Sequence, residues 1–294
     1  MRHRCAAMLT ALAGSFSLAL PAAAAAPDGT AYHLYRPGLR PAPAAAPAGA
    51  ATMLYYGGPV IASVKIVVVM WGKGVPRTTG SHIKPFFQAL VNSTYVDQLA
   101  QYSTNITGVN GHPGTNQTIG RGSFRGKFRI TPANGSKTLT DGDVQTELKA
   151  QIAAGALPAA DLNTLYMIYF PADITITLGG GRSCQSFGAY HEAVSSTVTP
   201  SNVFYGVMPD CGGGFSTITS VSSHEFAEAI TDAIPTPGTH PAYPQAWNTS
   251  NGYEIGDLCE SHQTTLAGGG ETYTVQEVFT NSTNACATGK FTSP

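Results

Sequence analysis

Positive charge is missing from a long stretch of this chain, because no lysine or arginine occurs between Ser183 and Gly289. Acidic side chains in that stretch therefore need a counter-charge other than a local base. A broad basic surface for nucleic acid is excluded there. The short basic run at 121–129 alternates with apolar residues and indicates a strand with one solvated face or a blunted sheet edge. The acidic residues are Glu192, Asp210, Glu225, Glu228, Asp232, Glu254, Asp257, Glu260, Glu271 and Glu277.

Several familiar motifs are absent as well. The chain has no C-x-x-C pair, no G-x-S-x-G elbow, and no glycine-rich loop with the lysine of a phosphate cradle. These absences disfavour a cysteine-ligated zinc site, a serine hydrolase and a phosphate-binding loop.

The N-terminus has the pattern of a secretory signal. A basic start at residues 1–4 precedes an apolar run to Leu20, and A-x-A sites lie near residues 24–26. We expect a signal peptide over 1–26, a Pro/Ala-rich linker or short propeptide over 27–52, and a single domain over 53–294. The protein is then secreted, extracellular or periplasmic, with no membrane span after cleavage; a retained N-terminal anchor is the alternative.

Four cysteines remain after that cleavage, and an even number in an exported chain predicts two disulfides. Four cysteines allow three pairings. The modest loops that they close favour Cys184–Cys211 and Cys259–Cys286.

Strand and helix patterns are interleaved without a regular repeat, which predicts an α+β domain with a mixed sheet. We expect this sheet to be zincin-like, disulfide-stapled, and to support a metal-binding active-site helix. The expected strands cover 62–72, 123–131, 164–171, 186–194, 202–209 and 273–279. The expected helices cover 81–103, with Pro85 in the first turn, 140–155 and 216–234.

The segment SSHEFAEAITDA, residues 222–233, carries the chemistry. At 100° per residue its apolar side chains share one helix side, and these are Phe226, Ala227, Ile230 and Ile234. The opposite side carries one imidazole and three carboxyl groups: His224, Glu225, Glu228 and Asp232.

Like charges at i and i+4 destabilise a helix, and Glu228 and Asp232 form such a pair without a lysine in range. Asp232 also lies near the helix C-terminus, where the helix dipole disfavours an acid. A divalent cation resolves the conflict; an ordinary solvated helix face is the alternative.

The spacing His-Glu-x-x-Glu resembles the H-E-x-x-H motif of metallohydrolases, in which two ligands at i and i+4 bind zinc. Here Glu228 stands in place of the second histidine, and His224 is the first ligand. Glu225 is then the general base that activates the metal-bound water. Zn²⁺ is the expected ion, whereas a carboxylate-rich site also suits Mn²⁺ or Ca²⁺.

The segment NGYEIGDLCE, residues 251–260, offers a third ligand. By analogy with zincins that use a later glutamate, Glu254 completes the set, and Asp257 hydrogen-bonds the free nitrogen of His224. Asp232 is expected in the same outer layer. Alternatively, Glu254 and Asp257 are turn residues, and His240 and His262 are rival ligands.

The segment CQSFGAYHEAV contributes Tyr190 and His191, which we expect to line the cleft from the sheet edge. His191 is the candidate catalytic residue there, as a transition-state donor or substrate contact. The alternative is that both are ordinary strand residues.

Four segments together, YYGGPVI…VKIVVVMWG, SCQSFGAYH, SSHEFAEAITDA and YEIGDLCE, resemble the phosphate-induced/EXORDIUM-like family and its secreted bacterial relatives. The resemblance spans most of residues 55–286. Many plant members of that family lack the His-Glu pair and are described as extracellular growth-related proteins. The resemblance therefore implies an extracellular protein and leaves its activity open.

Two functions follow from these observations. The first is a secreted zinc peptidase or related hydrolase that acts on a peptide or protein. The second is a non-catalytic extracellular or cell-wall-associated protein, with possible glycan contact and a structural or vestigial metal site.

Overall fold

A computed structural model describes residues 51–109, 111–195, 202–235 and 241–294. The predicted signal peptide and residues 27–50 of the predicted linker lie outside the described residues. Within the described residues, no helix has both the length and the apolar character needed to cross a membrane.

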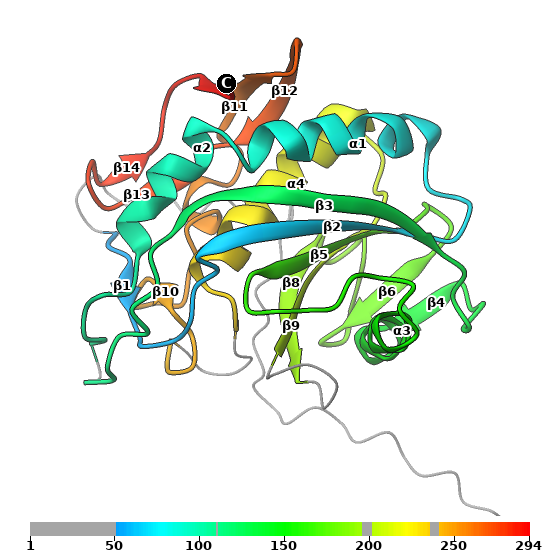
Figure 1. Ribbon diagram of the computed structural model, residues 1–294, viewed down its shortest axis with the longest axis horizontal. Coiled ribbons are helices and arrows are strands. Elements are labelled where there is room, and N and C mark those ends of the chain that lie inside the picture. Colours follow the sequence, from blue (N-terminus) through cyan, green and yellow to red (C-terminus); the bar gives the residue numbers. More distant parts are fainter. Residues whose placement is uncertain (1–50, 110, 196–201, 236–240) are drawn as a thin grey trace, which may run out of the picture.

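A five-stranded mixed sheet forms the centre of the domain (Figure 1). Its order is β3-β2-β5-β9-β8, in which β3, β2, β5 and β9 run parallel and the edge strand β8 runs antiparallel to β9. The strands are β2 (Ser63–Trp71), β3 (Gly120–Ile130), β5 (Thr164–Tyr169), β8 (Tyr190–Ser195) and β9 (Asn202–Met208).

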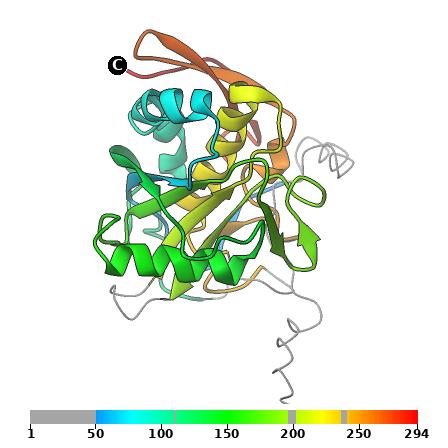
Figure 2. The same ribbon diagram turned by 90° about the vertical axis from the view of Figure 1, so that its right-hand side faces the viewer.

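Both faces of this sheet are covered, as the continuous apolar character of β2 predicts. On one face Ile66 and Val68 belong to a core that α1 and α4 complete, and on the other Val67 and Val69 pack with α3. Figure 2 shows α3 on one side of the sheet and α1 with α4 on the other. The helix with the His-Glu motif, α4, is therefore an internal element.

The helices are α1 (Arg77–Leu90), α2 (Thr94–Asp97), α3 (Asp141–Ala153) and α4 (Gly214–Thr231), with 3₁₀ turns η1 (Gln98–Tyr102) and η2 (Asp257–Cys259). The single helix predicted over 81–103 is wrong, because the Ser93 side chain accepts a hydrogen bond from Tyr95 N and starts a new helix there. Helix α1 also begins earlier than predicted, so Pro85 lies inside it and not in its first turn.

The C-terminal part covers α4 from the side away from the sheet. Strands β11 (Gln263–Gly268) and β12 (Glu271–Gln276) form a hairpin, and β12 packs along α4 while β11 contacts α1. The remaining short strands are β1 (Leu54–Tyr55), β4 (Thr138–Thr140), β6 (Thr175–Leu178), β7 (Gly181–Arg182), β10 (Trp247–Asn248), β13 (Phe279–Thr280), β14 (Ala285–Cys286) and β15 (Phe291–Thr292).

The predicted disulfides are both confirmed, Cys184–Cys211 and Cys259–Cys286. Such bonds persist in oxidising compartments, which is consistent with a protein outside the cytosol. The mixed α/β character is confirmed as well.

Helix α3 begins with a capping box. The Thr140 side chain accepts a hydrogen bond from Asp143 N at 3.1 Å, and the Asp143 carboxylate accepts one from Thr140 N at 2.8 Å. Replacing Thr140 with alanine should lower the free energy of unfolding by about 1 kcal/mol, measured by urea denaturation. Thr146→Ala, an exposed change inside the same helix, is the control, and an equal loss in both variants contradicts the cap.

Candidate metal centre

The polar side of helix α4 is buried along with its apolar side. The three glycines at 212–214 all have positive φ, and Gly213 is the N-cap residue at φ 79°, a conformation that favours glycine. From Ile218 to Thr231 every residue of α4 is buried. The interpretation of the His/Glu side as a solvated face is therefore wrong.

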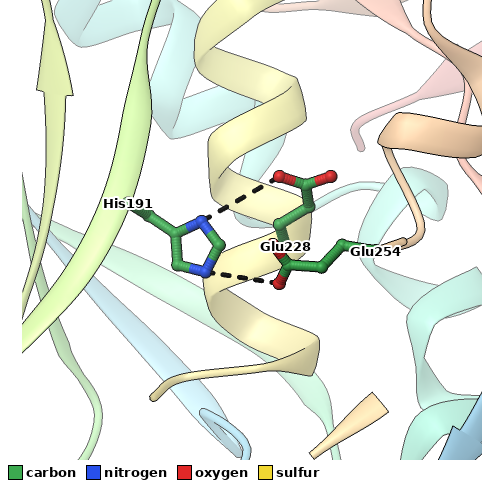
Figure 3. A group of neighbouring side chains, drawn as sticks. All are labelled: His191, Glu228 and Glu254. Carbon is green, nitrogen blue, oxygen red and sulfur yellow. Dashed lines mark ion pairs between the residues drawn. The ribbon is translucent and has the colours of Figure 1, made fainter. Parts of the chain in front are cut away.

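Two other segments bring side chains to this buried polar side. Strand β8 contributes His191, and the loop before η2 contributes Glu254. Both side chains lie beside Glu228 of α4 (Figure 3). His191 Nδ1 lies 3.9 Å from Glu228 Oε2, and His191 Nε2 lies 3.5 Å from Glu254 Oε1. The three side chains are at most 3% exposed.

Glu228 is held at one oxygen and directs the other into the cluster. Its Oε1 accepts hydrogen bonds from Gly256 N at 3.1 Å and Asp257 N at 3.0 Å. Its Oε2 lies 3.0 Å from His224 Nε2, the neighbour one helical turn earlier. The backbone of the 256–257 segment thus fixes the orientation of this carboxylate.

His224 and Gly256 are in close contact with a glutamine of β12. The Gln276 Nε2 atom lies 2.8 Å from His224 Nδ1 and donates a hydrogen bond to Gly256 O, also at 2.8 Å. A Cβ atom on Gly256 would lie 2.6 Å from His224 Nδ1 and 2.7 Å from Glu228 Oε1. Only glycine fits between these two side chains.

The carboxyl groups of the cluster are buried close together and repel one another when they are ionised. Burial, followed by the charges of Glu228 and Asp232, raises the pKa of Glu254 well above its usual value. Burial likewise raises the pKa of Glu225. Although burial alone lowers the pKa of His224, the charges of Glu228 and Glu225 raise it to about 10. A cation among these groups relieves the repulsion.

Two groups of side chains have ligand atoms close enough to hold one metal ion. One is His191, Glu228 and Glu254, and the other is His224, Glu225 and Glu228; within each group these atoms lie within 4.8 Å of one another. The ligands predicted from sequence, His224, Glu228 and Glu254, are divided between the groups. Glu228 is common to both.

A buried carboxylate oxygen of Glu225 also indicates that a metal ion fits the donor set. The Glu225 Oε2 atom lies 3.3 Å from His191 Nδ1, whereas its Oε1 is buried and has no hydrogen-bond partner among the described residues. A buried carboxylate oxygen without a partner is costly. One imidazole with carboxylates is a donor set that Zn²⁺ and Mn²⁺ accept.

The predicted outer residues occupy different places. The carboxylate of Asp232, the C-cap residue of α4, accepts hydrogen bonds from Ala246 N and Asn248 Nδ2, while its carbonyl oxygen lies 3.1 Å from His191 Nε2. Asp257 Oδ2 accepts a hydrogen bond from Glu254 N. At His224 Nδ1, where sequence reasoning expected Asp257, the structure has Gln276.

The remaining residues that were predicted from the sequence, Tyr190, His262 and His240, are not part of the cluster as described. Tyr190 packs in the core on the α3 side of the sheet. Because neighbouring residues of a strand point to opposite sides, His191 faces α4 and Tyr190 does not line the cluster. His262 is 56% exposed and lies 3.8 Å from Glu277. His240 lies outside the described residues. Sequence reasoning did not identify Gln276 or Gly256 as parts of the site. The only signal for Gln276 was a polar residue within an apolar strand, and the only signal for Gly256 was a glycine two residues after Glu254.

Comparison of the chain with family models, curated proteins and solved structures found no match. The resemblance to EXORDIUM-like proteins stays a prediction.

Proposed function

We propose that this protein is a secreted metal-dependent hydrolase, in which Glu225 is the general base. The observation that carries the proposal is the buried cluster of two histidines and three glutamates, in which Glu225 Oε1 lacks a hydrogen-bond partner among the described residues. Peptide is the proposed substrate class by analogy with the H-E-x-x-H helix. The internal helix and mixed sheet support a zincin-like arrangement.

Glu228, an imidazole and Glu254 would hold the ion. A bound Zn²⁺ supplies Lewis-acid chemistry, since it polarises a carbonyl oxygen and makes water more acidic. The backbone N–H groups of Gly256 and Asp257 keep Glu228 Oε2 directed into the cluster.

Glu225 has the properties that a general base needs. Burial raises the pKa of its carboxyl group above the usual value, which makes the carboxylate a stronger base. Its Oε2 faces His191 Nδ1, which leaves Oε1 to accept a proton from the attacking water. The same oxygen can return that proton to the leaving amine nitrogen.

A second function is favoured by the depth of the site. His191, His224, Glu225, Glu228 and Glu254 are each at most 2% exposed. Such burial suits a non-catalytic extracellular or cell-wall-associated protein whose ion, Zn²⁺, Mn²⁺ or Ca²⁺, is structural.

Metal removal distinguishes the two functions. We expect the purified chain to contain about one equivalent of zinc by plasma emission spectrometry, and chelation to abolish hydrolysis of unfolded casein until zinc is returned. A structural site predicts that chelation lowers the melting temperature of a protein that never hydrolysed casein. A chain that neither contains nor takes up Zn²⁺, Mn²⁺ or Ca²⁺ contradicts both.

A further inference from the structure

The cluster contains two imidazoles, and their ring nitrogens face different kinds of atoms. A neutral histidine carries one proton, so it can coordinate a metal only through the nitrogen that lacks this proton. The atoms around each ring decide which nitrogen that is. His191 and His224 differ in this respect.

His224 faces a donor at Nδ1. The Gln276 amide nitrogen lies 2.8 Å from Nδ1, and an amide nitrogen can donate hydrogen bonds but not accept them. Its second hydrogen bond, to Gly256 O, fixes the amide in this orientation. In the neutral ring, Nδ1 is therefore the nitrogen that accepts. The ring proton is then on Nε2, which lies 3.0 Å from Glu228 Oε2 in a contact that does not have hydrogen-bond geometry.

His191 faces oxygen acceptors at both nitrogens. Nδ1 lies 3.3 Å from Glu225 Oε2, and Nε2 lies 3.1 Å from the carbonyl oxygen of Asp232. Either nitrogen can keep the proton while the other offers its lone pair. His191 also belongs to the group of possible ligands that includes Glu228 and Glu254.

We propose that His191 of strand β8, together with Glu228 and Glu254, is the imidazole ligand of the metal, and that His224 is a positioning residue. The His224 ring lies against Glu228 Oε2 and so limits the positions open to that ligand, and Gln276 holds the ring in place. The inference rests on the proposed metal site and changes its composition. The HExxE motif then supplies a ligand, Glu228, and a base, Glu225, but no imidazole ligand.

The test uses Cd²⁺ as an NMR probe. The mature chain is labelled with ¹⁵N-histidine, loaded with ¹¹³Cd²⁺, and the coupling between cadmium and the ring nitrogens is recorded. One histidine should show this coupling in the wild type. The coupling should disappear in His191→Asn and persist in His224→Asn.

Affinity for Cd²⁺ gives a second measurement by competition with a chromophoric chelator. His224→Asn should weaken binding by about 10- to 100-fold, as expected for a residue that orients a ligand, and His191→Asn by more. Near-ultraviolet circular dichroism checks that both variants fold. If His191→Asn does not fold, His224→Asn alone decides, because coupling that persists there supports the assignment.

Loss of coupling in His224→Asn overturns the assignment to His191, whereas coupling to both histidines in the wild type overturns the role of His224 as a positioning residue. Either result leaves the hydrolase proposal intact. A wild-type chain that binds neither Cd²⁺ nor Zn²⁺ overturns both.

Discussion

Replacing Glu225 with glutamine should lower the turnover number for peptide hydrolysis by about 10²- to 10⁴-fold, the usual contribution of a general base. Glutamine preserves the shape of the side chain and can still accept a hydrogen bond from His191 Nδ1. It cannot take a proton from water at the position of Oε1. The measurement is the initial rate of casein or peptide hydrolysis at saturating substrate.

Two controls make the result specific. The metal content of Glu225→Gln should equal that of the wild type, because the variant keeps His191, Glu228 and Glu254. Glu192→Gln removes a carboxyl group beside His191 in sequence but on the opposite side of β8, and should leave turnover within a few-fold of the wild type. Unchanged hydrolysis in Glu225→Gln contradicts its role as base.

Replacing Gly256 with alanine should disrupt the cluster although it removes none of its ionisable side chains. The new Cβ would lie 2.6 Å from His224 Nδ1 and 2.7 Å from Glu228 Oε1, so the loop has to move. That movement strains the two hydrogen bonds to Glu228 and the one from Gln276. We expect a loss of about 3 kcal/mol in the free energy of unfolding, from overpacking and weakened buried hydrogen bonds.

Thermal unfolding and metal titration measure this effect. For a domain of this size the loss corresponds to a fall of about 6 to 12 °C in melting temperature. Metal affinity should fall by about 10- to 100-fold, because the backbone that orients Glu228 has shifted. Gly135→Ala is the matched control, since an added Cβ there meets nothing within 4 Å. Equal melting temperatures for the two variants contradict the proposed fit of Gly256.

Much of the local structure could be predicted from the sequence. Apolar, β-branched runs marked the central strands, and the loop lengths favoured the disulfide pairs that the structure contains. The prediction failed at 81–103, where Ser93 caps a second helix, because a serine in a helical pattern does not reveal whether its side chain bonds the backbone.

Helical periodicity alone determined that His224 and Glu228 are neighbours, because residues four apart on a helix stand one above the other. It could not determine what covers them. The contacts of His191 with Glu225 and of His224 with Gln276 join residues 34 and 52 positions apart, and no local pattern encodes such pairs.

The sequence by itself thus determined that this protein places one imidazole and several carboxyl groups on one side of a helix, in a segment without lysine or arginine. Only the tertiary structure decided that this side is buried, that β8 adds a second imidazole, and that Gln276 and Gly256 fit against His224. The physical reason is that periodicity reports which side chains share a face of one element, whereas the partners of that face depend on how distant elements pack.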